Sequence, residues 1–135
     1  MTAVELLERL IGFPTVSRDS NLELIRFVEE YLTQHDVEHW RIDSDDGSKA
    51  NLLARLGPAV EGGVVLSGHT DVVPVDGQPW STDPFELIDK DDGRLYGRGT
   101  CDMKGFIACA LAEVPNWIQH DLARPIYLAF SYDEE

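Results

Sequence analysis

Two short apolar segments constrain the fold of this chain more than any other part of it. Residues 63–68 are apolar almost throughout, which is typical of an inner strand that is covered on both faces of a sheet. Residues 125–132 form a second strongly apolar run and predict another strand. Both runs lead directly into side chains that can bind a metal ion or exchange a proton.

The segments around these two strands carry further helical and strand-like patterns. The predicted elements are helices over residues 3–12, 21–35 and 103–114, strands over 37–42 and 51–56, and a hairpin formed by 85–88 and 94–96. Thr2 and Glu5 form a capping box at the first helix, and Pro115 is expected to end the third. Helices that alternate with apolar strands predict an α/β fold, with helices layered around a largely parallel, mixed sheet.

The composition excludes two classes of partner. The 135 residues carry a formal net charge of −14, so the chain lacks the Lys and Arg that bind nucleic-acid phosphates. No apolar run is long enough to cross a bilayer, and no membrane partner is expected. With two cysteines and no secretory signal pattern, the protein is expected to be cytoplasmic.

Five side chains at the ends of predicted elements could together form a metal-dependent site. In parallel sheets, ligands bind at the C-terminal ends of the strands, which is where His69 and the pair Glu134 and Glu135 are expected. Imidazole nitrogen and carboxylate oxygen both suit zinc, so His69 could bind one ion and Asp102, beside a glycine-rich loop, could bridge two. Asp71 could accept a hydrogen bond from the second ring nitrogen of His69. Of the two glutamates, one could bind metal and the other could act as a general base.

Each of these motifs also has an ordinary structural explanation. A His followed by an Asp is often a helix cap or a surface pair, Gly-Arg-Gly-Thr is often only a turn, and Asp-Glu-Glu after a strand is often a solvated loop. Their occurrence together, each at the boundary of an element, favours the catalytic interpretation.

The same motifs resemble those of the dinuclear zinc amidohydrolases, a family that includes acetylornithine deacetylase, succinyl-diaminopimelate desuccinylase and aminoacylase. The residues that carry the resemblance are 67–74, Trp80, 83–85, 97–99, 102–105 and 133–135, so that it extends over nearly the whole chain. Residues 99–106 are most similar to the acetylornithine deacetylases within this family.

The resemblance implies both a site and a reaction. His69 would bind one zinc ion, Asp102 would bridge two and Glu135 would bind the second, with cobalt as a possible substitute. Glu134 would be the general base and Asp71 would orient His69. The substrate would be a small acylated amino acid: the acetyl amide of Nα-acetyl-L-ornithine would be hydrolysed to L-ornithine and acetate in arginine biosynthesis, by an enzyme that forms a homodimer.

Members of this family are far longer than this chain, and they carry a further carboxylate ligand, a histidine ligand and an inserted lid and dimerisation domain. Residues 1–135 are therefore expected to be a truncated, N-terminal part of the catalytic metal-binding domain, inactive or nearly so and weak in metal binding. Apolar edges left uncovered are expected to cause self-association or marginal stability. Two alternatives remain open. One is another amidohydrolase, such as a succinyl-diaminopimelate desuccinylase or a dipeptidase, and the other is a non-catalytic metal-binding or assembly module.

Overall fold

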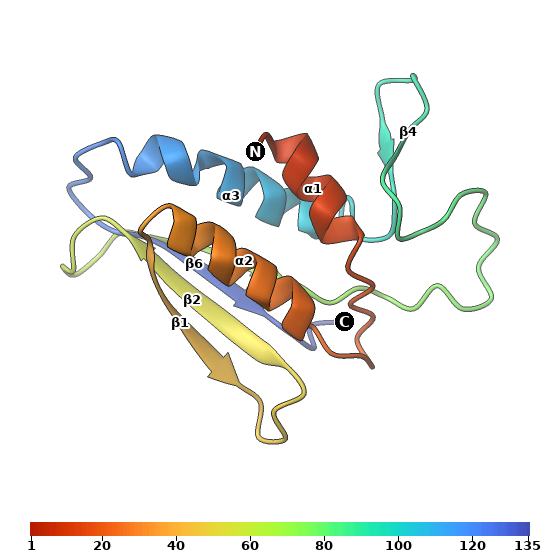
Figure 1. Cartoon of the computed structure of the whole chain (residues 1–135), viewed down its shortest axis with the longest axis horizontal. Coiled ribbons are helices and arrows are strands. Elements are labelled where there is room, and N and C mark those ends of the chain that lie inside the picture. Colours follow the sequence, from red (N-terminus) through yellow and green to blue (C-terminus); the bar gives the residue numbers. More distant parts are fainter.

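The centre of the fold is a four-stranded sheet with the strand order β1-β2-β6-β3; Figure 1 labels the first three of these strands. A computed structural model describes all residues of the chain, 1–135. Its elements, in chain order, are α1 (Ala3–Ile11), α2 (Leu22–Gln34), β1 (Glu38–Asp43), β2 (Ala50–Leu56), β3 (Val64–His69), β4 (Ile88–Asp89), β5 (Leu95–Tyr96), α3 (Lys104–Trp117) and β6 (Ile126–Ser131). The short strands β4 and β5 form the predicted hairpin as a separate two-stranded sheet.

The sheet is mixed, which confirms the predicted α/β class. β1 pairs with β2, and β2 with β6, in antiparallel register, whereas β3 and β6 are parallel. Because β3 and β6 run in the same direction, their C-terminal ends lie side by side, with His69 opposite Ser131. This one parallel pair brings together the residues that follow the two apolar segments.

The prediction that residues 63–68 form an inner strand is wrong. β3 lies at the edge of the sheet and pairs with β6 alone, and Val64 and Val65 are 55% and 61% exposed. An apolar run is sufficient to favour a strand, but burial also needs a neighbouring strand and a second covering layer. Residues 1–135 supply neither beyond β3, so its apolar side chains stay open to solvent.

The three helices lie on one side of the four-stranded sheet (Figure 1). Burial alternates along β2, so that Ala50, Leu52, Ala54 and Leu56 face the helices and the residues between them are only half-buried. α1 packs along α3, and α2 contacts β1 and β2. The predicted capping box is confirmed at α1: the Glu5 amide donates to the Thr2 hydroxyl, and the Thr2 amide donates to the Glu5 carboxylate. None of the helices combines the length and the apolar character that a membrane-crossing segment requires.

The third helix does not end at Pro115, as the sequence predicted, but continues to Trp117. A proline in a helix removes the hydrogen bond to the carbonyl four residues earlier, which here is that of Leu111. The Tyr31 hydroxyl of α2 donates to this Leu111 carbonyl at 3.0 Å and replaces the lost donor. A contact between two helices thus lets α3 accommodate the proline in its last turn.

Candidate functional site

The candidate site lies at the C-terminal ends of β3 and β6. His69 is the last residue of β3 and is only 6% exposed. Glu134 and Glu135 follow the end of β6, and Asp102 belongs to the turn that precedes α3. The structure therefore brings His69, Asp102 and Glu135 together from segments that are far apart in the sequence.

The side chains of these three residues form a compact set of possible ligand atoms. One atom each from His69, Asp102 and Glu135 lies within 4.8 Å of the others. His69 Nε2 is 3.0 Å from Asp102 Oδ1 and 3.6 Å from Glu134 Oε2. Atoms that bind one zinc ion at about 2 Å can be at most about 4 Å apart, so small side-chain rotations would suffice to hold a divalent cation. The donor set fits such an ion, while the ligand role of each residue stays a prediction.

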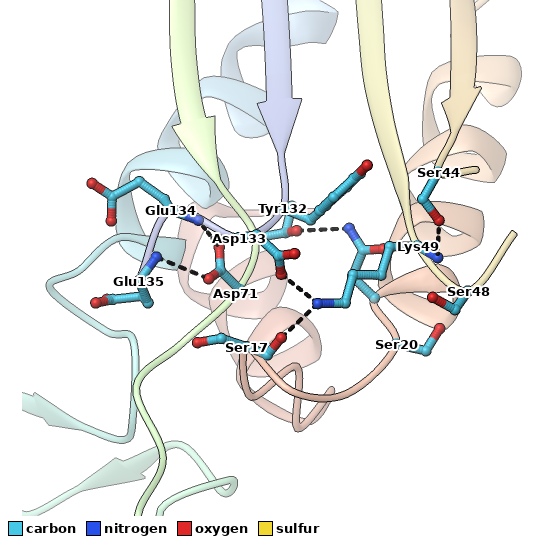
Figure 2. Close-up of polar contacts among 12 residues, drawn as sticks. Ser17, Ser20, Ser44, Ser48, Lys49, Asp71, Tyr132, Asp133, Glu134 and Glu135 are labelled. Carbon is cyan, nitrogen blue, oxygen red and sulfur yellow. Dashed lines mark hydrogen bonds and ion pairs between the residues drawn. The ribbon is translucent and has the colours of Figure 1, made fainter. Parts of the chain in front are cut away.

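Asp71 has a different set of contacts from the one expected. The shorter contact of His69 Nδ1, at 3.0 Å, is with the backbone carbonyl oxygen of Asp71, and the Asp71 carboxylate is 3.5 Å away. The carboxylate instead accepts hydrogen bonds from the backbone amides of Glu134, at 3.3 Å, and Glu135, at 3.1 Å (Figure 2). Asp71 therefore fixes His69 through its main chain and the two glutamates through its side chain.

The electrostatics of the site follow from the crowding of carboxylates around one imidazole. Burial lowers the pKa of His69, but the Asp71 carbonyl, the Asp102 carboxylate and the nearby acidic charges together raise it above its ordinary value. The pKa of Glu135 is also raised, first by desolvation and then by the negative charges of Asp102 and Glu134. A carboxylate held among other carboxylates gains from a bound cation, since the cation removes this repulsion.

The turn that carries Asp102 is held at its base by Lys104. Lys104 is fully buried, and its Nζ donates to the carbonyl of Leu10 at 2.9 Å and to that of Phe13 at 2.6 Å. Burial lowers the pKa of Lys104 to about 7, although the charge of Asp71 acts in the opposite direction. Sequence reasoning missed this residue because a lysine beside a glycine-rich turn carries no pattern that indicates burial.

A buried hydrogen-bond network supports the strand ends next to the site. The Thr70 hydroxyl donates to the carbonyl of Ser131 at 2.9 Å and accepts from the Asn21 amide at 2.9 Å. The Asn21 side chain also bonds both the N–H and the carbonyl of Ala50, although Asn21 is the N-cap residue of α2 and makes no capping bond. This network, which the sequence analysis did not detect, joins the C-terminal ends of β3 and β6 to the start of β2.

A small cavity of about 170 Å³ adjoins Asp102 and Glu135. Its lining includes Arg98, whose guanidinium lies over the ring of Trp80 at 5.2 Å and is bonded to Gln78. A cation in this wall offsets part of the negative charge of the neighbouring carboxylates. The cavity gives the candidate ligands a concave, polar surface rather than a flat one.

A model of a known protein family matches more than half of the chain. The family is described as peptidase family M20/M25/M40, and the match covers residues 65–135. These residues include all five of the side chains discussed above, from His69 to Glu135.

Several curated relatives are similar to nearly the whole chain. An acetylornithine deacetylase from Proteus mirabilis is 39% identical over 99% of this chain, and one from Aliivibrio salmonicida is 46% identical over 97% of it. These alignments cover only 36% and 35% of the relatives. The chain thus spans about a third of the length of the curated relatives it matches.

Solved structures with the same fold are also found. Human carnosine dipeptidase 1 is 28% identical with a TM-score of 0.78, over 96% of this chain and 31% of that one. The M20 family metallo-carboxypeptidase Sso-CP2 from Sulfolobus solfataricus has a TM-score of 0.80 over 96% of this chain and 30% of that one; at 21% identity this likeness concerns the fold alone.

Proposed function

This chain belongs to peptidase family M20/M25/M40, a family of hydrolases, and from that premise we propose that it forms the metal-binding part of an acetylornithine deacetylase. The reaction would be hydrolysis of the acetyl amide of Nα-acetyl-L-ornithine to L-ornithine and acetate. The observation that carries the proposal is the meeting of His69, Asp102 and Glu135 at the ends of two parallel strands. Identities of 39% and 46% to acetylornithine deacetylases support this substrate over others of the family.

His69, Asp102 and Glu135 would hold the cation, Zn²⁺ or Co²⁺. A divalent cation bound there would polarise the amide carbonyl and lower the pKa of a water molecule. Asp102 is 74% exposed at its side chain, and its Oδ1 atom contacts His69 Nε2 at 3.0 Å, so this carboxylate could bridge two ions once a cation replaces that contact. Two ions would need further ligands, which would come from outside residues 1–135.

Glu134 would be the general base. Its Oε2 atom is 3.6 Å from His69 Nε2, but the residue is not one of the three that share the compact ligand set. Oε2 would accept a proton from the attacking water and then deliver it to the leaving amine. The Asp71 carboxylate accepts hydrogen bonds from the amides of Glu134 and Glu135, and these bonds would keep the base at a fixed position relative to the neighbouring metal ligand.

The proposed reaction also suggests a pathway, an oligomeric state and a compartment for the enzyme. We place it in arginine biosynthesis, as a homodimer in the cytoplasm. Its two free cysteines agree with a reducing compartment. The 135 residues alone would be inactive or nearly so, because they carry too few ligands for two ions.

A chimera tests this proposal. Residues 1–135 would replace the aligned third of the Proteus mirabilis acetylornithine deacetylase, and release of ornithine would be measured with Zn²⁺ or Co²⁺ present. We expect activity in the chimera, a loss of at least about 100-fold on Glu134→Gln, and no change on Glu23→Gln, which alters an exposed residue of α2. A Glu134→Gln chimera as active as its parent would refute the assigned role, and robust hydrolysis by the 135-residue chain alone would refute the need for further ligands.

A dipeptidase is the second candidate, since human carnosine dipeptidase 1 has the same fold at 28% identity. The chimera and the unmodified Proteus mirabilis protein would each be assayed with Nα-acetyl-L-ornithine and with dipeptides. A shift of the rate ratio toward dipeptides in the chimera would favour this candidate, and an unchanged ratio would favour the deacetylase.

A further inference from the structure

Lys49 is a largely buried cation close to the candidate site that neither the family motifs nor the proposed chemistry uses. It lies in the turn between β1 and β2, and its side chain is only 15% exposed. Its Nζ donates to the backbone carbonyl of Ser17 at 2.6 Å and forms an ion pair with the carboxylate of Asp133 (Figure 2). A lysine with two such acceptors joins the two segments to which they belong.

The segment of Ser17 is paired with the residues that follow His69. The Ser17 amide donates to the Val72 carbonyl at 3.1 Å, and the Val72 amide donates to the Thr15 carbonyl at 2.9 Å. Val72 directly follows Asp71 in the sequence and is fully buried. The Ser17 carbonyl is therefore fixed relative to the loop that carries His69 and Asp71.

The segment of Asp133 leads directly to the two glutamates. Asp133 has a positive φ of 56°, a left-handed conformation that non-glycine residues seldom adopt, and the chain turns there after β6. The Tyr132 amide before it donates to the Asn51 side chain at 3.2 Å, and the Glu134 and Glu135 amides after it donate to Asp71. Lys49 pairs with the side chain of Asp133, the residue at which the chain turns, which lies in sequence between the Tyr132 bond and the two glutamate bonds.

We propose that Lys49 is a positioning residue, which ties the loop of His69 and Asp71 to the turn at Asp133 and so sets where Glu134 and Glu135 meet His69. The inference rests on the proposed function in one respect, that the site binds a divalent cation. In Figure 2 the side chains of Glu134 and Glu135 extend away from Lys49, so Lys49 acts through the backbone rather than by touching their carboxylates.

The sign of one measurement separates positioning from a simple effect of charge. A positive charge near a cation site weakens binding by repulsion, so its removal should tighten binding if charge were the whole role of Lys49. If Lys49 positions the glutamates, its removal should weaken binding instead. The two accounts therefore predict opposite changes for Lys49→Met.

The experiment titrates the 135-residue chain with Co²⁺ and follows the visible absorption of the bound ion. The buffer contains no urea, and each variant is first shown to be folded in it. We expect Lys49→Met to bind about tenfold more weakly, Lys49→Arg to retain most of the affinity, and Lys90→Met, a matched change of an exposed lysine in the β4–β5 hairpin, to leave it unchanged. Asp133→Asn should reproduce the loss, and the double variant Lys49→Met/Asp133→Asn should be little worse than either single one.

Hydrogen exchange of the Glu134 and Glu135 amides in the metal-free chain, measured by NMR, gives a second readout. It should be at least about fivefold faster in Lys49→Met than in Lys90→Met if Lys49 holds the turn. Unchanged exchange together with unchanged or tighter Co²⁺ binding would overturn the inference. If the unsubstituted chain does not bind Co²⁺, His69, Asp102 and Glu135 do not suffice as a cation site, and the exchange rates alone decide the role of Lys49.

Discussion

The carboxylate of Asp71 holds the backbone of Glu135: its Oδ2 atom accepts a hydrogen bond of 3.1 Å from the Glu135 amide. Oδ1 accepts a second bond, of 3.3 Å, from the amide of Glu134. Asp71 is 3% exposed, so these bonds are shielded from competing water. The loop after β3 and the turn after β6 are thus joined at the point where both deliver side chains to the site.

Replacing Asp71 by Asn should weaken cation binding without unfolding the chain. The side-chain NH₂ group of Asn would replace one carboxylate oxygen of Asp71. This group donates and cannot accept, so the backbone amide of either Glu134 or Glu135 would lose its acceptor. We expect about tenfold weaker Co²⁺ binding, measured by visible absorption. Asp76→Asn is the matched control, because Asp76 is exposed and pairs only with Arg18. Equal affinity in Asp71→Asn and Asp76→Asn would contradict the prediction.

Replacing His69 by Ala should abolish most of the cation binding, since His69 is the only nitrogen donor in the compact ligand set. Calorimetric titration with Zn²⁺ would measure the loss, which we expect to exceed about 100-fold. His39→Ala serves as the control, because His39 lies in β1 and its ring contacts the carbonyl of Val37, just before that strand, and not the candidate site. A similar loss in both variants would show that binding takes place elsewhere.

Cation binding should depend on pH through His69. Only the neutral imidazole binds a metal ion, and the pKa of His69 is raised above its ordinary value by its acidic neighbours. Proton competition should therefore begin at a higher pH than for an ordinary histidine, and the affinity for Co²⁺ should fall about tenfold for each further unit of decrease. A titration series across neutral pH measures this, and an affinity that is flat down to pH 5 would exclude His69 as a ligand.

The stability of the folded chain should rise with pH above neutrality because of Lys104. The pKa of Lys104 is about 7 in the folded chain, whereas 10.5 is the ordinary lysine value and applies to the unfolded chain. Between these two pH values the unfolded chain binds the proton and the folded chain does not. The free energy of unfolding should therefore increase from pH 7 to 10, by on the order of 1 kcal/mol per unit. Urea unfolding would test this against Lys104→Met, which has no titrating amine at this position and should lack this slope.

Gly105 should not tolerate a side chain. A Cβ there would lie 2.3 Å from the carbonyl oxygen of Thr100, so the turn that carries Asp102 would have to move. Gly105→Ala should lower the free energy of unfolding by about 1–3 kcal/mol in urea. Gly12→Ala is the control, because its Cβ would meet only contacts of 3.4 Å or more at a φ of −62°. Equal stability of the two variants would contradict the prediction.

The elements and the candidate ligands could be predicted because their signals are local in the sequence. Apolar runs and a capping box indicate strands and a helix, and the positions of His69 and Glu135 after two apolar runs indicate one edge of a sheet. The edge position of β3 could not be predicted in this way, because it depends on which neighbouring strand is present. The continuation of α3 past Pro115 depended in turn on a donor, the Tyr31 hydroxyl, from another helix.

The supporting contacts of the site were the least predictable part. Lys49 and Asn21 act through backbone carbonyls and amides far away in the sequence, and such bonds leave no spacing or composition signal. The carboxylate of Asp71 was expected to bond the His69 ring, the nearest partner in sequence. In the folded chain its shortest hydrogen bonds come from amides more than sixty residues away, which only the parallel pairing of β3 with β6 brings near.

The three residues of the compact ligand set are evenly spaced along the chain, with 33 positions from His69 to Asp102 (102 − 69) and 33 from Asp102 to Glu135 (135 − 102). An ion held by all three would close two loops of equal length, as a pair of crosslinks would, and would withdraw much of the freedom of the unfolded chain. Ion binding would then be linked to folding, so that a chelator would lower the melting temperature of the chain and added ion would raise it.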